Sequence, residues 1–145
     1  MKISKGLSES LEKYEYFVPY VDSYSVWSRQ QNGIPASYKC FLGSKSLDLE
    51  EREFRQTLPI LTDEDAGIID LAAAQVTSKS KLKKQLFDLL VISGWDCVDV
   101  FFNFPSLKKL MRANHEKYSI PILEAKRREL IEAVRTTLIL FEDNE

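Results

Sequence analysis

The chain has 145 residues, of which 44% are hydrophobic and 29% are charged, and its net charge is −2. This composition is that of an ordinary globular protein, and the length suffices for one domain with its own core. No apolar run approaches the roughly 20 residues that cross a bilayer, and the first six residues lack the apolar stretch of a secretory signal. We therefore expect one cytoplasmic domain, residues 1–145, with no membrane contact.

The first 33 residues predict helical segments. Apolar residues recur every three or four positions up to Pro19, which is expected to end the first segment. A second apolar face follows from Tyr20 to Gln31, and the turn at Gly33 is expected to end it. Residues 34–60 are the least regular part of the chain, and we predict an ordered connection there with a short helix near 47–56.

Residues 62–94 predict two helices. Thr62 is a candidate N-cap, and the three acidic residues at 63–65 fit the positive end of a helix dipole. These three could instead form a catalytic or metal-binding cluster, but a helix N-terminus explains them without further assumptions. Ser80 is a candidate cap for the next helix, which is expected to end at Gly94.

Three further helices are predicted in the C-terminal third. Asp96 is a candidate cap for a short helix that Pro105 closes. Ser106 is a candidate cap for a basic helix that reaches Lys117. Pro121 fits the first turn of a long amphipathic helix, which is expected to end near Phe141. With no convincing strand, the fold is predicted to be all-α, a compact helical domain with a long C-terminal helix.

Side chains that bind metals or perform catalysis are scarce. Cys40 and Cys97 are 57 positions apart and His115 is the only histidine, so the chain lacks a zinc-binding pair of the usual spacing. Two free thiols are expected, because a reducing cytosol disfavours disulfides. The chain also lacks a glycine-rich phosphate loop. We therefore expect no enzymatic activity, no metal and no cofactor.

The charge is distributed unevenly along the chain. Residues 79–128 carry eleven positive and five negative side chains, a balance of +6, whereas residues 1–78 and 129–145 each carry −4. A short helix, a tight turn and a basic helix are the arrangement that places a helix in the DNA major groove. We therefore predict a helix-turn-helix-like element at about residues 80–117. The candidate DNA-binding residues are Ser106, Lys108, Lys109, Arg112, Asn114, Lys117, Lys126, Arg127 and Arg128.

Each of these features has a plainer alternative. The basic residues could form a solvated helix face, and His115 is expected to be a surface or packing residue. Three successive residues at 126–128 point about 100° apart on a helix, so they cannot all face one partner. The apolar stripe of the last helix could pair with a second protomer, as a homodimer on DNA, although such a stripe is more often core.

Four short segments, in the same order along the chain, resemble the phage antitermination protein Q family, in its short branch without a zinc finger. They are YSVWSRQ at 24–30, GIPAS at 33–37, LTDEDAGIID at 61–70 and LFDLLVISG at 86–94. The last segment ends at the glycine that opens the helix-turn-helix in that family. The stretch after it, at 98–102, is bulkier and more acidic here than in the family.

The resemblance implies a phage late-gene regulator that binds duplex DNA near a promoter and loads onto bacterial RNA polymerase. DNA contact would then come from the basic helix, and the aromatic segment near Trp27 and Tyr38 would face the polymerase, together with the acidic N-terminal portion. The alternative is a small cytosolic interaction protein, such as an immunity protein or an inhibitor of a host or toxin enzyme, without nucleic-acid binding.

Overall fold

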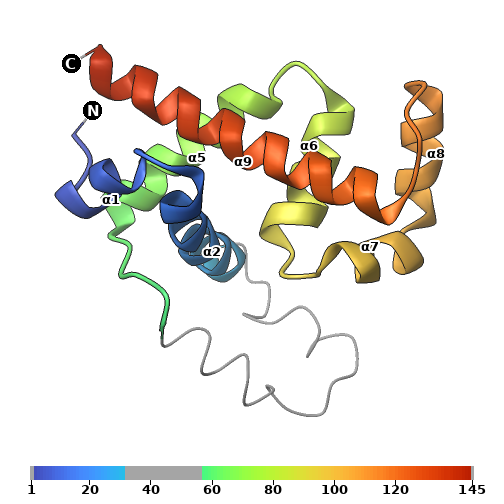
Figure 1. The fold of residues 1–145 in the computed structure, drawn as a ribbon, viewed down its shortest axis with the longest axis horizontal. Helices are drawn as coiled ribbons and strands as arrows, with labels where there is room; N and C mark the ends of the chain where they lie inside the picture. The colour runs from blue at the N-terminus through green and yellow to red at the C-terminus, as the bar shows by residue number, and fades with distance from the viewer. Residues whose placement is uncertain (1, 32–56, 145) are drawn as a thin grey trace.

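The computed structural model describes residues 2–31 and 57–144, and the regular elements in these ranges are all helices (Figure 1). The predicted all-α fold with a long C-terminal helix is confirmed. The short helix predicted near 47–56 lies outside the described residues. In chain order the elements are α1 (Lys5–Ser10), α2 (Tyr14–Gln31), α5 (Asp63–Thr77), α6 (Lys81–Phe87), the π-helix η1 (Asp88–Ile92), α7 (Cys97–Asn103), α8 (Pro105–Ala113) and α9 (Ile120–Asp143).

Helix α9 is the central helix, against which most of the others pack. It is 24 residues long and packs against α5, α2, α6 and α7. Figure 1 shows both chain ends beside α1 at one end of α9, and α8 at the other end. The predicted apolar stripe of α9 is buried, except that Phe141 is only half buried. Its buried members are Leu123, Leu130, Ile131, Val134 and Leu138.

A proline lies inside α2, so the prediction that Pro19 ends the first helix is wrong. The break comes earlier, after α1, and Pro19 is the sixth residue of α2. A proline inside a helix costs about 3 kcal/mol, largely through a lost backbone hydrogen bond. Phe17 and Val21 lie on either side of it and are buried in the core. Burial of two such side chains contributes about 3–6 kcal/mol, which offsets the cost of the proline.

Three of the predicted N-caps are confirmed. The side-chain oxygen of each cap accepts a hydrogen bond from the backbone N–H three residues later, which satisfies one of the free donors at a helix start. The caps are Thr62 of α5, at 3.1 Å, Ser80 of α6, at 3.2 Å, and Asp96 of α7, at 2.8 Å.

The cap predicted for the basic helix is wrong. Helix α8 begins at Pro105, so Ser106 is already its second residue, and the flanking residue Phe104 makes no side-chain cap. Proline is favoured as the first helical residue because its fixed φ matches the helix and its missing N–H would have no partner there. As a result Phe104 alone joins α7 to α8, a shorter link than the three or four residues of a helix-turn-helix.

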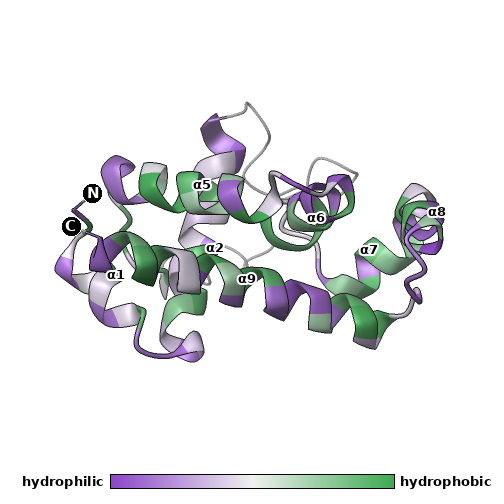
Figure 2. Cartoon of the chain, turned by 90° about the horizontal axis from the view of Figure 1, so that it is seen from above, coloured by the Kyte–Doolittle hydropathy of each residue, from purple (hydrophilic) through white to green (hydrophobic). Residues whose placement is uncertain are grey.

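The apolar faces of α6, η1, α7 and α8 join the core that α9 organises. Cys97 is a free, buried thiol in this core, and Cys40 lies outside the described residues. Figure 2 shows α8 at the far end of the row of helices, with hydrophobic and hydrophilic residues on the same short helix. In the ranges that the structure describes, no helix is long and apolar enough to cross a membrane.

Candidate nucleic-acid interface

Helix α8 is amphipathic, with one apolar and one basic face. Leu107 and Met111 are fully buried, and they fasten the helix to the core. Lys108, Lys109 and Arg112 are exposed. Residues three and four apart lie on one helix face, so Arg112 follows both lysines on the outward side. Helix α8 therefore turns its apolar side chains toward the core and its basic side chains outward.

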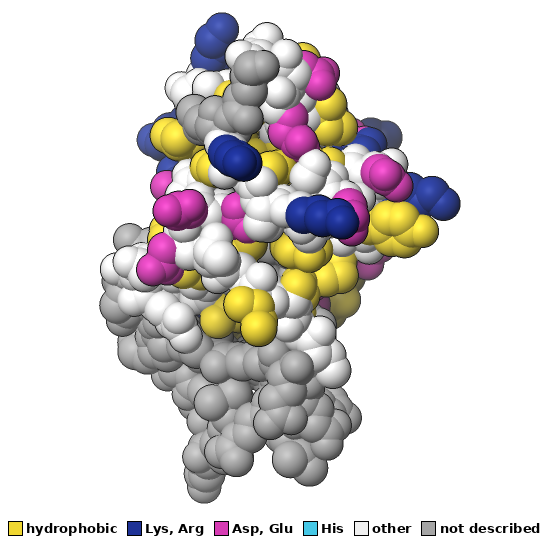
Figure 3. All heavy atoms as spheres, turned by 90° about the vertical axis from the view of Figure 1, so that its left-hand side faces the viewer, with side chains coloured by type: hydrophobic (Ala, Val, Ile, Leu, Met, Phe, Trp, Pro, Cys, Tyr) yellow, Lys and Arg dark blue, Asp and Glu magenta, His cyan; other side chains and the backbone are white. Residues whose placement is uncertain are grey.

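The basic face of α8 has no compensating carboxylate among the described residues. In residues 2–31 and 57–144, no ion pair involves Lys108, Lys109, Arg112 or Lys117. At the opposite end of the molecule, Figure 3 shows positive and negative side chains interspersed. Uncompensated cations on a single face attract a polyanion, because the potential near them is not cancelled by neighbouring carboxylates.

The basic helix ends earlier than predicted, at Ala113 rather than at Lys117. His115 adopts a left-handed backbone with φ of 59° and is exposed, as expected for a surface residue. The N–H of Glu116 donates to the carbonyl of Met111 at 2.9 Å, which closes the helix in a Schellman motif. The Asn114 amide donates to the carbonyl of Leu110 at 2.8 Å, so this predicted DNA-binding side chain also caps the helix.

Aromatic contacts hold α7 against the segment that follows α8. The Phe101 ring stacks on Tyr118 with centroids 4.8 Å apart, and the Tyr118 hydroxyl donates to the carbonyl of Phe101 at 2.8 Å. Burial raises the pKa of this hydroxyl, so it remains a donor at neutral pH. Trp95 packs edge-on against Phe104, with centroids 5.4 Å apart. These contacts position α8 relative to α7 although only one residue links them.

The three predicted DNA-binding residues on α9 all have partners within the chain. The Lys126 ammonium lies 3.0 Å from the carboxylate of Glu116. The Arg128 guanidinium lies over the Tyr14 ring, 4.3 Å from its centroid. Arg127 points between α2 and η1. The structure thus separates this group from α8, whose basic side chains face outward and make no ion pair with residues 2–31 or 57–144.

Arg127 supports the π-helix that leads to α7. Its Nε donates to the carbonyl of Leu90 at 3.0 Å, and its Nη2 lies 3.6 Å from a carboxylate oxygen of Asp22. Arg29 supports the same element from α2 by donating to the carbonyl of Ile92 at 2.7 Å. Burial raises the pKa of Asp22 above its ordinary value, and the two arginines act in the opposite direction. Both guanidinium groups therefore satisfy carbonyls near the end of η1.

We expect Arg127→Met to destabilise the fold by about 1–2 kcal/mol, because the Leu90 carbonyl and the Asp22 carboxylate lose a charged partner. An aspartate with a raised folded-state pKa costs stability when ionised, above the pKa of about 4 that it has in the unfolded chain. Removing Arg127 enlarges this cost. The loss should therefore be larger at pH 7 than at pH 4, as measured by urea unfolding at both values.

Arg128→Met is the matched control for Arg127→Met. Arg128 is exposed and its guanidinium covers the Tyr14 ring without satisfying a backbone carbonyl in the described residues, so the control should change stability by less than about 1 kcal/mol. Equal losses in the two variants, or a loss in Arg127→Met that does not change with pH, would contradict the role assigned to Arg127.

The acidic residues at 63–65 form the first turn of α5, as predicted for a helix N-terminus. Asp63 accepts a hydrogen bond from the Trp27 indole at 3.0 Å. Asp65 is buried and accepts one from the Ser4 backbone N–H at 3.0 Å. Tyr38, the other predicted polymerase-facing aromatic, lies outside the described residues. These contacts tie α2 and the N-terminal segment to α5.

A hollow of about 590 Å³ lies between α2, α5, α6 and η1. Its polar groups pair with one another. The Tyr24 hydroxyl donates to Asp70 at 2.6 Å, and Lys84 lies 3.2 Å from Asp88. In the part of the chain that the structure describes, no group of three metal-ligating side chains is found. Because these charged side chains of the hollow already have partners, the hollow is a weaker candidate for binding a charged ligand than the basic face of α8.

No family model matches this sequence, and neither a curated protein nor a solved structure matches it significantly. The resemblance to the antitermination family therefore stays a prediction.

Proposed function

We propose that this protein is a DNA-binding transcription regulator of the phage antitermination type, and that the basic face of α8 contacts duplex DNA. The observation that carries the proposal is the group of three exposed cations on one face of α8, none of them in an ion pair within the described residues. The apolar face of the same helix is anchored by Leu107 and Met111. A rigid basic helix at one end of a molecule suits the DNA major groove, which admits an α-helix.

Binding to duplex DNA should depend steeply on salt. Each phosphate neutralised by a lysine or arginine releases counterions, so log K falls with log[salt] with a slope of about −0.9 per contact. With Lys108, Lys109, Arg112 and Lys117 in contact, affinity should fall about 100-fold between 50 and 200 mM salt. Fluorescence anisotropy with a labelled duplex measures this. Binding that is absent, or unchanged over this range, would overturn the proposal.

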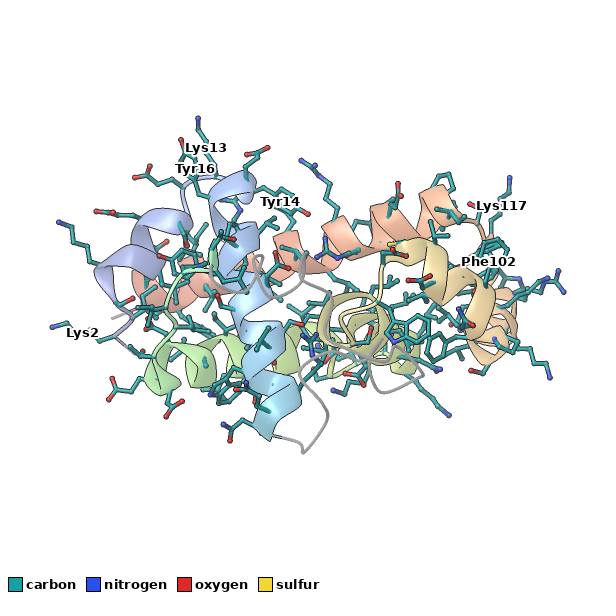
Figure 4. The ribbon with its side chains drawn as sticks, turned by 90° about the horizontal axis from the view of Figure 1, so that it is seen from below. Lys2, Lys13, Tyr14, Tyr16, Phe102 and Lys117 are labelled. Atoms are coloured by element: carbon teal, nitrogen blue, oxygen red, sulfur yellow. The ribbon has the colours of Figure 1, made fainter. Side chains whose placement is uncertain are left out.

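The triple variant Lys108→Ala, Lys109→Ala and Arg112→Ala should reduce the salt slope by about 3 and weaken binding to all duplex sequences alike. Its matched control removes the same charge from the other end of the molecule, at Lys2, Lys5 and Lys13. Figure 4 shows Lys2 and Lys13 far from Lys117. Equal effects of the two triple variants would show that net charge, rather than the face of α8, governs binding.

A regulator of the antitermination type also binds RNA polymerase, and a second experiment tests this contact. Purified bacterial RNA polymerase should co-elute with the protein in size-exclusion chromatography. The alternative, a small interaction protein without nucleic-acid binding, predicts no DNA binding by anisotropy and a specific complex with one enzyme, such as a nuclease or a toxin.

A further inference from the structure

An exposed aromatic ring lies at the end of α7, close to the link with α8. Phe102 is 71% exposed, whereas Val100 is fully buried and Phe101 and Phe104 are half buried. Its recorded ring contact is with Phe101, edge-on, with centroids 5.0 Å apart. Exposing a phenyl ring leaves its apolar surface in water. A single exposed apolar side chain is common on protein surfaces, so the case for a binding site depends on what lies near the ring.

The second signal is an exposed lysine at the same end of the molecule. Phe101 contacts both Phe102 and Tyr118, and Tyr118 directly follows Lys117 in the chain. Figure 4 shows Phe102 and Lys117 at the same end of the molecule, near α8. Lys117 is exposed and makes no ion pair in residues 2–31 and 57–144.

An acidic residue lies close to Phe102 in the sequence. Asp99 is one helical turn before Phe102 on α7. Its carboxylate repels phosphate on that side of the ring. A polyanion that reaches Phe102 would therefore approach from the side of Lys117 and α8.

We propose that Phe102 stacks on an unpaired nucleobase, so that the surface made by α8, Lys117 and Phe102 prefers DNA with a single-stranded segment adjoining the duplex. This inference rests on the proposed function, because the duplex is held by α8. Nucleobases offer a flat π-face to an aromatic side chain, and nearby cations hold the phosphates that flank the base. In a fully paired duplex the bases are stacked on one another, and the ring has no exposed base to meet.

An apolar groove of a protein partner fits this surface less well. Docking Phe102 into such a groove would bring Lys117 and the cations of α8 out of water without compensating carboxylates, which is costly. A nucleic acid can contact both the cations and the ring. Its phosphates neutralise the cations, and an unpaired base covers the ring.

The experiment compares a labelled blunt-ended duplex of two separate strands with the same duplex in which one strand carries a six-nucleotide single-stranded tail. Anisotropy at 50 mM salt should show tighter binding of the tailed DNA to the intact protein. Phe102→Ala and Phe102→Leu should weaken binding of the tailed DNA about 5- to 100-fold, which corresponds to the loss of one stacked base, and leave the paired duplex unchanged. Phe102→Trp should retain the preference, because it keeps an aromatic face.

Val98→Ala is the matched control, since Val98 is also an exposed apolar residue of α7 but offers no ring to stack. Circular dichroism checks that each variant keeps its helices. Equal binding of the two DNAs by the intact protein, or equal effects of Phe102→Ala on both DNAs, would overturn the inference while leaving the proposed function standing. Absence of binding to either DNA would overturn both.

Discussion

Replacing Gly94 by alanine should destabilise the fold by about 3 kcal/mol. Gly94 has φ of +82°, and a side chain in that region costs about 1–2 kcal/mol. An added Cβ would also lie 2.7 Å from Nη1 of Arg29, too close for real atoms. The Arg29 guanidinium would have to move away from the Ile92 carbonyl, and the loss of a hydrogen bond to a charged group costs about 1.5–3 kcal/mol.

Gly67→Ala is the matched control for this variant. Gly67 lies within α5, and nothing lies within 4 Å of the position of an added Cβ. Alanine is a better helix former than glycine, so this change should stabilise the protein by up to about 1 kcal/mol. Urea unfolding followed by circular dichroism measures both variants. A loss below about 1 kcal/mol in Gly94→Ala would show that the turn accommodates a side chain by shifting Arg29.

The second large effect is expected from Leu107→Ala, with a loss of about 3 kcal/mol. Leu107 is fully buried on the inner face of α8. Truncation of such a leucine removes its burial energy and leaves a cavity. Leu107 lies in the first turn of α8, so the cavity weakens the attachment of that helix to the core. The loss should appear as a lower urea midpoint with an unchanged dependence of the free energy on denaturant concentration.

Leu110→Ala makes the same chemical change three residues later. Leu110 is only half buried, so its truncation should cost clearly less than that of Leu107. Equal losses in the two variants would contradict the orientation of α8, and with it the assignment of Lys108, Lys109 and Arg112 to the outward face.

The local features of this fold were predictable from short-range patterns. A cap needs one side-chain oxygen and a backbone N–H three residues later, so Thr62, Ser80 and Asp96 are recognisable in the sequence. The apolar stripe of α9 follows from helical periodicity alone. Ser106 failed as a cap because the adjacent Pro105 occupies the first helical position, and the proline was the stronger local signal.

Phe102 was not among the predicted DNA-binding residues, although a sequence signal for its exposure existed. The apolar positions Cys97, Val100, Phe101 and Phe104 follow the helical period, and Phe102 falls outside this stripe. An aromatic residue off the buried face is expected to be exposed. The stronger pattern of charge drew the prediction toward the basic residues between 106 and 128.

The residues at 126–128 show that a charge pattern does not determine which partner each basic side chain contacts. Seven basic residues lie between 106 and 128. The sequence places the last three on a separate helix, where they cannot all face one partner, but it does not show which group each of them contacts. The contacts of Arg127 depend on α2 and η1, which are distant in the chain and bring Asp22 and the Leu90 carbonyl to it.

Composition, helical periodicity and caps sufficed for the all-α class, most helix starts and the outward basic face of α8, because these depend on interactions within one or two helical turns. The ends of helices, the passage of α2 through Pro19 and the partners of Arg29 and Arg127 depended on packing between distant segments. Burial of apolar side chains outweighs a local preference of a few kcal/mol, so only the assembled core could decide them.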